Sequence, residues 1–131
     1  MNNCCVCGSQ QTFALCCEPF IKQRKVATTP EQLMRSRYSA YALGGCGEYL
    51  LKTWFAPMAR GLTPKELSEI SQEWLGLRVI GSGSSGNEGW VEFRASYKRD
   101  GVKGELHERS AFTLVGSRWL YIGGEITTFN G

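Results

Sequence analysis

The feature that most constrains this chain is the group of cysteines at its start. Five of the six cysteines lie within the first 17 residues, and four of them form two close pairs, Cys5 with Cys7 and Cys16 with Cys17. Eight residues separate the pairs, so one short loop can bring four thiolates together. Four thiolates in a tetrahedron suit a structural zinc ion, with Zn–S distances of about 2.3 Å. The spacing therefore predicts a metal site, with zinc as its metal.

Other uses of these cysteines stay open. Disulfides or metal-free thiols would also fit, but the chain starts without the basic and apolar regions of a signal peptide, so we expect a cytoplasmic protein with reduced thiols. Cys4 stands next to the first ligand and could replace it if the register shifted. Cys46 has no motif around it and is expected to be a small core or surface residue rather than a nucleophile.

Hydropathy and charge limit the partners. No apolar run approaches the roughly 20 residues that cross a bilayer, so we expect no membrane span. The formal net charge is +3, and a zinc ion held by four thiolates would lower it to about +1. Three basic residues follow the cysteines (Lys22, Arg24 and Lys25), which is too few for a phosphate-binding surface. We therefore expect no nucleic-acid partner.

The middle of the chain has the signals of helices. Thr29 is expected to cap a helix that starts at residue 30, with Gln32 completing a capping box and Gly44 ending the helix. A second helix is expected over residues 47–55 and a third over residues 63–72. Helical spacing places four side chains on one face of the first helix: Met34, Arg37, Tyr38 and Tyr41.

From residue 74 the apolar pattern changes to an alternation of two, which indicates strands. The first strand is expected to have Leu75, Leu77 and Val79 on one face, and residues 81–86 are expected to form a loop. Three further strands are expected over residues 90–98, 106–114 and 118–122, with a hairpin turn at Asp100-Gly101. Helices followed by an antiparallel meander predict an α+β fold.

The cysteine segment resembles a known motif. Cys5-Val6-Cys7-Gly8-Ser9, followed by Phe13 and Cys16-Cys17, is similar to the SEC-C zinc motif, which ends the bacterial translocation ATPase SecA and occurs in many small proteins. The resemblance implies Zn²⁺ bound by the four paired cysteines and a protein partner for this zinc knuckle, since the motif of SecA contacts the chaperone SecB. Val6 and Gln10 stand where the motif usually has Pro and Gly, and its usual lysines are missing, so we do not carry the SecB contact over.

Further segments extend the resemblance to nearly the whole chain. Thr53-Trp54 and residues 33–42, 106–112 and 118–122 are similar, in the same order, to the YchJ family of small bacterial proteins. This resemblance implies two domains, a zinc knuckle over residues 1–24 and a domain similar to nuclear transport factor 2 over residues 25–131. The second domain is then a cone, in which about three helices pack into the mouth of a curved antiparallel sheet.

Such a cone can enclose a pocket. Strand alternation places Glu108 and Ser110 on the apolar, inward face of their strand and turns His107 away from it. A buried carboxylate needs a partner, and Arg35 or Arg37 on the first helix is the expected one. One interpretation is a structural Arg–Glu pair between helix and sheet, and the other is a ligand or catalytic pocket with Glu108 as base.

Two functions follow from these patterns. The first is a non-enzymatic adaptor, in which a structural zinc fills its coordination sphere with cysteines and the knuckle docks a protein; this interpretation assigns no catalytic residue. The alternative is a small-molecule-binding protein or enzyme with a pocket inside the cone, where Glu108 acts as base beside Ser110, Arg35 or Arg37. A cavity above about 300 Å³ holding an unpaired Glu108 would favour the alternative, and a filled cone with Glu108 bound to arginine would favour the adaptor.

Overall fold

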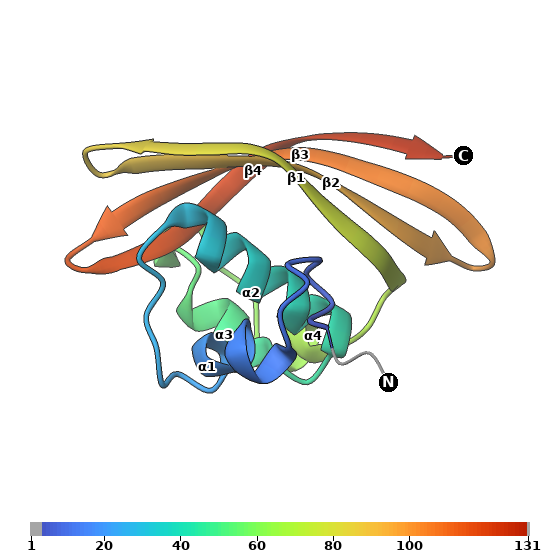
Figure 1. The fold of residues 1–131 in the computed structure, drawn as a ribbon, viewed down its shortest axis with the longest axis horizontal. Helices are drawn as coiled ribbons and strands as arrows, with labels where there is room; N and C mark the ends of the chain where they lie inside the picture. Colours follow the sequence, from blue (N-terminus) through green and yellow to red (C-terminus); the bar gives the residue numbers. More distant parts are fainter. Residues whose placement is uncertain (1–3, 131) are drawn as a thin grey trace.

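A four-stranded antiparallel sheet forms one layer of the fold, and the helices cover one of its faces (Figure 1). The structure is a computed structural model that describes residues 4–130, with side chains described through residue 126. The strands pair in chain order as a meander: β1 (Glu73–Ser85), β2 (Glu88–Arg99), β3 (Val102–Val115) and β4 (Arg118–Asn130). The predicted α+β fold is confirmed, and the sheet curves around the helices as expected.

The longest helix, α2 (Pro30–Leu43), lies across the covered face of the sheet. Its predicted start is confirmed, because the Thr29 side chain accepts a hydrogen bond from the Gln32 amide at 3.1 Å. Gly44, with φ of 73°, ends the helix. The remaining helices are short: α1 (Glu18–Ile21), α3 (Gly47–Lys52), α4 (Pro64–Ser68), and the 3₁₀ turns η1 (Phe13–Leu15) and η2 (Ala56–Met58).

Two helices are shorter than predicted. The second one ends at Lys52 and not at residue 55, because the chain leaves the helix to pair with β4. There the Phe55 amide donates to the Tyr121 carbonyl, and the Tyr121 amide donates to the Thr53 carbonyl, each at 2.8 Å. The third helix ends at Ser68 rather than residue 72, since the backbone of the next residue is already extended.

The first strand differs most from its prediction. A register shift between Trp74 and Gly76 inserts an extra residue, so Leu75 is 45% exposed and does not share a face with Leu77. Most of the predicted glycine–serine loop, residues 81–85, is instead the end of β1, and only Gly86 lies in the turn. Its glycines allow the Trp90 indole to lie against the strand, since a Cβ on Gly83 would come within 2.8 Å of that ring.

The other strands confirm the predicted alternation and are longer. Asp100 and Gly101 form the predicted hairpin turn, with φ angles of 52° and 81°. β3 starts four residues before its predicted start at 106, and β4 continues beyond residue 122, because ladder hydrogen bonds extend strands where side-chain alternation is weak. Glu108 and Ser110 face inward on β3 as predicted, with 7% and 2% exposure.

The core lies between α2 and the sheet and also takes in the N-terminal cysteines. Its most buried large side chains are Phe112, Leu33, Leu50 and Val91. Cys5, Cys7 and Cys17 belong to the same cluster of buried residues. The division into domains at residue 24 stays a prediction. Among the described residues, none of the helices has the length and apolar character needed to cross a bilayer.

Candidate functional site

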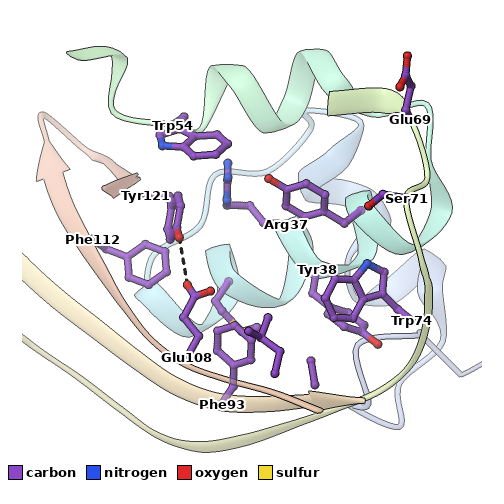
Figure 2. A pocket seen from close by; sticks show the side chains of 14 residues that line it. Arg37, Tyr38, Trp54, Glu69, Ser71, Trp74, Phe93, Glu108, Phe112 and Tyr121 are labelled. Atoms are coloured by element: carbon purple, nitrogen blue, oxygen red, sulfur yellow. Dashed lines mark hydrogen bonds between the residues drawn. The ribbon is translucent and has the colours of Figure 1, made fainter. Parts of the chain in front are cut away.

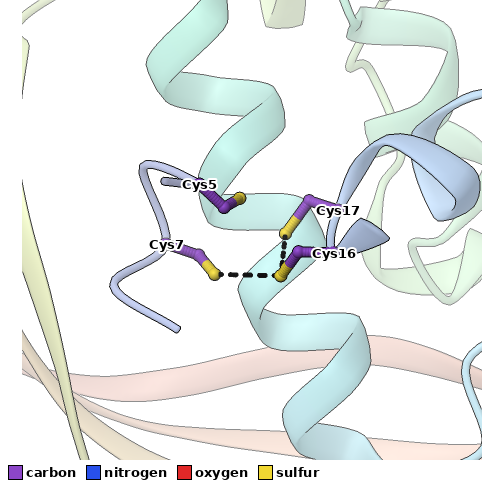
Figure 3. Close-up of side chains that lie close together, drawn as sticks. All are labelled: Cys5, Cys7, Cys16 and Cys17. Carbon is purple, nitrogen blue, oxygen red and sulfur yellow. Dashed lines mark hydrogen bonds between the residues drawn. The ribbon is translucent and has the colours of Figure 1, made fainter. Parts of the chain in front are cut away.

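The sulfur atoms of Cys5, Cys7, Cys16 and Cys17 converge on one point beside α2 (Figure 3). All four lie within 4.8 Å of one another, and we call them the cysteine cluster. The sulfurs of Cys7 and Cys16 are 3.6 Å apart, and those of Cys16 and Cys17 are 3.8 Å apart. A tetrahedron with metal–sulfur distances of about 2.3 Å has sulfur–sulfur edges of about 3.8 Å. The cluster therefore has the dimensions to bind one metal ion.

The loop between the two pairs is closed by its own backbone. The Cys5 amide donates to the Gln11 carbonyl at 2.7 Å, and the Gly8 amide donates to the Cys5 carbonyl at 3.2 Å. Gln10 has a φ of 70°, a left-handed conformation that costs a side-chain-bearing residue energy. The SEC-C motif, which this segment resembles, usually has glycine at this position, and glycine adopts this conformation without that cost.

Helix α2 supports the cluster from one side. The Cys5 sulfur is 3.5 Å from the Ser39 hydroxyl, and Arg35 donates from Nη1 to the Cys7 carbonyl at 2.7 Å. The same Nη1 is 3.9 Å from the Cys7 sulfur. On the loop itself, the Ser9 hydroxyl is 3.0 Å from the Cys16 sulfur. Such donors around thiolates orient the ligands and offset their negative charge.

The closeness of the four sulfurs shifts the pKa values of three of the thiols in different directions. Hydrogen bonds, the largest from Cys17, lower the pKa of Cys7 to about 4. The pKa of Cys17 is raised, first by its hydrogen bond to Cys7 and then by burial, and burial raises the pKa of Cys16. One anionic sulfur is thus favoured at the expense of its neighbours. A divalent cation would allow all four to be thiolates, because ligand sulfurs bind metal in the deprotonated form.

The other two cysteines lie outside the cluster. Cys4 is exposed, with its sulfur 3.5 Å from the Gln10 carbonyl, and Cys46 is half-buried, with its sulfur 3.5 Å from the Gly44 carbonyl. None of the six cysteines, all within the described residues, forms a disulfide. The register with Cys5 as the first member of the cluster is therefore the one that the structure adopts.

Gly8→Ala is expected to destabilise the protein by about 2–3 kcal/mol. Gly8 has a φ of 82°, and a Cβ there would lie 2.9 Å from the Leu77 carbonyl oxygen of β1, so the loss combines backbone strain with a clash against a strand. Gly61→Ala is the matched control, because its φ is 84° and nothing lies within 4 Å of its Cβ. We expect about 1 kcal/mol there. Urea unfolding measures both, and equal losses would contradict docking of the loop on β1.

A different face of α2 lines an apolar pocket of about 260 Å³ (Figure 2). Seven of its fourteen lining residues are aromatic. The charged residues are Arg37 from α2, Glu108 from β3, and Glu69, which directly follows α4 and is exposed. The helix face predicted from spacing, Met34 to Tyr41, is confirmed as one wall of this pocket.

No arginine among the described side chains bonds directly to Glu108, so the predicted Arg–Glu pair is wrong. Its Oε2 atom accepts hydrogen bonds from the Ser110 hydroxyl and, at 3.0 Å, from the Tyr121 hydroxyl. Arg35 binds elsewhere, because its guanidinium donates to the Glu31 carboxylate and to the Cys7 carbonyl from a different face of α2. The carboxylate is therefore satisfied by hydroxyl groups, and the cone is neither filled nor locked by an ion pair.

Arg37 is buried, with 5% exposure, and its guanidinium bonds to neutral groups. Its Nη1 atom donates to the Leu50 carbonyl and to the Thr53 hydroxyl, both at 2.6 Å. Its guanidinium carbon lies 4.8 Å from the Trp54 ring and 4.7 Å from the Tyr121 ring. Burial lowers the pKa of Arg37, with nearby Glu108 among the groups that oppose this shift. The helix–sheet lock is thus made of hydrogen bonds and cation–π contacts.

His107 confirms the predicted parity. It faces away from Glu108, and its Nε2 atom is 2.7 Å from the Glu92 carboxylate. Arg109 lies on the same face, 3.7 Å from Glu92 and 4.1 Å from the Trp90 ring centroid. The histidine therefore belongs to a polar network outside the pocket.

Sequence reasoning missed the hydroxyl of Tyr121 as a partner of Glu108. The strand pairing places Phe112 opposite Tyr121, with a register shift between Ala111 and Phe112. This shift brings the ring over the pocket, 5.7 Å from the Phe112 ring. No local signal in the sequence gives the position of such a bulge.

The fold and the cysteine cluster define a class of small α+β proteins with a nuclear transport factor 2-like sheet and an N-terminal segment of paired cysteines. The family description "YchJ, middle NTF2-like domain" matches residues 29–124. The chain is 42% identical over 124 residues to UPF0225 protein VV1358 of Vibrio vulnificus, covering 92% of this chain and 73% of that protein. The chain therefore belongs to the YchJ family.

Two solved structures are similar to this one. The solution structure of RPA3114, a SEC-C motif-containing protein from Rhodopseudomonas palustris, is 38% identical with a TM-score of 0.84, covering 93% of this chain and 97% of that one. A crystal structure of a SEC-C motif-containing protein from Psychrobacter arcticus is 26% identical with a TM-score of 0.77, covering 97% and 82%.

Proposed function

We propose that this protein binds one structural Zn²⁺ ion through Cys5, Cys7, Cys16 and Cys17 and acts as a non-enzymatic interaction module. The observation that carries the proposal is the convergence of four sulfurs within 4.8 Å, at spacings that match a tetrahedral tetrathiolate site. The SEC-C descriptions of the two similar solved proteins support the same assignment.

A structural role for the metal follows from its ligands. Four cysteines complete a tetrahedral coordination sphere and leave no position for a water molecule or substrate. Three of the four are buried, with 4% exposure for Cys5, 0% for Cys7 and 1% for Cys17. The ion would join the N-terminal loop to α1 and hold both against α2, and it would do so in the reduced environment of the cytoplasm.

Docking of a protein partner is supported by two apolar side chains beside the ligands. Val6 lies between Cys5 and Cys7 and is 45% exposed, and Leu15 precedes Cys16 and is 77% exposed. A metal site that fixes their backbone would present them as a rigid apolar surface, which lowers the entropy cost of binding. We propose that this surface contacts the partner.

Metal binding is tested by adding Co²⁺ to the metal-free, reduced protein. A tetrathiolate site gives the strong visible absorption of tetrahedral cobalt at one ion per chain, and added Zn²⁺ then removes it. Cys16→Ser should lose this spectrum, whereas Cys46→Ser, outside the cluster, should keep it. An octahedral cobalt spectrum, or the same spectrum in Cys16→Ser, would overturn the proposed ligand set.

Docking is tested separately by Leu15→Glu, which leaves all four ligands in place. This variant should bind cobalt normally and lose the partners that the unchanged protein captures from a cell extract. Met58→Glu is the matched control, since Met58 is also an exposed apolar residue, at 57%, but lies in η2. If both variants capture the same partners as the unchanged protein, the knuckle is not the docking surface.

A second candidate function is binding of a small molecule in the pocket beneath α2. The specific observation in its favour is an apolar cavity of about 260 Å³ into which a buried arginine and a buried glutamate face. Buried charges beside empty space are what ligand sites use to orient a molecule. In this proposal Glu108 accepts a hydrogen bond; its use as a base in an enzyme stays a prediction.

A further inference from the structure

We infer that the pocket takes a small, flat, electrically neutral molecule that carries a hydrogen-bond acceptor and donor side by side, as an aromatic carboxamide does. The inference rests on the second candidate function, pocket binding, and names the chemistry of the ligand. It follows from the size of the pocket, from its walls and from the two charged groups inside it.

The size and walls select a flat ring. Engineered cavities of about 150 Å³ bind benzene, so about 260 Å³ leaves room for roughly ten non-hydrogen atoms. Figure 2 shows Trp54 and Tyr121 at one end of the pocket and Tyr38 and Trp74 at the other. Their ring centroids are 5.2 Å and 5.7 Å apart within each pair, in edge-to-face arrangements. Aromatic walls of this kind pack best against a planar π-system.

The charges select a neutral ligand. Arg37 and Glu108 contribute one charge of each sign, and both are buried. An anion could contact Arg37 but would be repelled by Glu108 and, at the exposed end, by Glu69, whereas a cation could contact Glu108 but would be repelled by Arg37. The charges of Arg37 and Glu108 cancel in the empty pocket, so either ligand would leave a net charge in apolar surroundings, which is costly. A neutral molecule avoids this penalty and still has two polar groups to bind.

The hydrogen-bonding capacity left on these groups selects an adjacent donor and acceptor. Both bonds to Glu108 go to Oε2, and no residue in the range 4–126 donates a hydrogen bond to Oε1. Arg37 has five N–H groups, of which Nη1 uses two on Leu50 and Thr53. The remaining three are left for Tyr41, which neighbours the guanidinium, and for a ligand carbonyl. A carboxamide offers a carbonyl to Arg37 and an N–H to Glu108.

Four probes of similar size test this class: benzamide, benzoate, benzylammonium and cyclohexanecarboxamide. Binding is followed by the fluorescence of the tryptophans, two of which line the pocket, and by NMR shifts of the zinc-loaded protein. We expect a benzamide Kd on the order of 1 mM or tighter, as for a fragment of about nine atoms. The two charged probes should bind at least tenfold more weakly, and the non-planar amide at least threefold more weakly.

The Glu108→Gln substitution tests whether the Glu108 carboxylate binds the ligand. It keeps the size of the side chain, and it should weaken benzamide at least fivefold while narrowing the difference between benzamide and benzoate. Glu92→Gln, on the outer face of the sheet, should leave all four affinities unchanged.

The outcomes separate the ligand class from pocket binding itself. Tightest binding of benzoate or benzylammonium would overturn the neutral class while supporting the pocket as a binding site. Unchanged benzamide binding in Glu108→Gln would overturn the role of that carboxylate. If no probe shifts the pocket resonances at 10 mM, a concentration about tenfold above the expected Kd, pocket binding and the ligand class both fail, and the zinc proposal is untouched.

Discussion

Cys17→Ser is expected to lower the free energy of unfolding by about 5 kcal/mol or more in the presence of zinc. Structural zinc contributes about 10–16 kcal/mol of binding free energy in small zinc-finger peptides, and most of it is lost with one ligand. Cys17 is also 1% exposed within the core shared with α2, so its loss is felt beyond the N-terminal loop. Urea unfolding of both proteins, reduced and zinc-loaded, measures the difference.

Two controls separate the metal from the side chain. Cys46→Ser replaces a half-buried cysteine outside the cluster and should cost about 1 kcal/mol or less. A chelator should destabilise the unchanged protein by nearly as much as the Cys17→Ser substitution does, and should have little further effect on that variant. A chelator effect of equal size in both proteins would contradict a zinc site at Cys17.

Arg37→Met is expected to destabilise the protein by about 3 kcal/mol. The substitution keeps an apolar side chain of similar length but removes hydrogen bonds to the Leu50 carbonyl and the Thr53 hydroxyl, both inside the fold. Hydrogen bonds from a charged donor contribute about 1.5–3 kcal/mol each, and the contacts with the Trp54 and Tyr121 rings add to this. The gain in apolar contact offsets part of the loss.

Arg94→Met is the matched control for this prediction. Arg94 is 48% exposed and lies 3.3 Å from Glu105 on the surface, where an ion pair is worth about 1 kcal/mol or less. Thermal unfolding at fixed pH compares the two variants. If Arg37→Met is no more destabilising than Arg94→Met, the hydrogen bonds and ring contacts of Arg37 do not stabilise the packing of α2 against α3 and β4.

The parts of the fold set by nearby residues could be predicted from the sequence. The cap of α2 depends on Thr29 and Gln32, three residues apart, and the turn at Asp100-Gly101 depends on two neighbours. The cysteine pairs are equally local, since one loop of eight residues joins them. In each case the interacting groups are close along the chain, so their spacing carries the geometry.

The parts set by distant residues could not be predicted. Residues 53–55 leave the helical pattern because they pair with Tyr121, nearly 70 positions later. Leu75 faces outward because of a bulge that depends on the partner strand β2. A period of two or of 3.6 indicates which element forms, but a one-residue shift in pairing reverses every side chain beyond it.

The pocket shows the same limit. Alternation correctly placed Glu108 on the inward face, but a face does not identify the partner of a side chain. The partner is a tyrosine on β4, and the expected arginines bind elsewhere: Arg35 to the carbonyl of Cys7 and Arg37 to that of Leu50. Opposite charges attract in any arrangement, whereas the hydrogen bonds formed depend on positions that only the folded chain supplies.

Helix α2 links the two candidate sites. Its Arg35 and Ser39 contact the cysteine cluster, and its Arg37, Tyr38 and Tyr41 line the pocket from a different face of the helix. A metal that holds the N-terminal loop against this helix would also fix one wall of the pocket. The metal site is therefore the part of the proposal on which the arrangement of the rest depends.

The proposed metal site is tested most directly by elemental analysis. It compares the zinc content of freshly purified, reduced protein with that of a Cys16→Ser/Cys17→Ser variant. We expect one zinc ion per chain in the unchanged protein and none in the variant. Unchanged protein without bound metal, or equal zinc in the two proteins, would contradict a metal held by these four sulfurs.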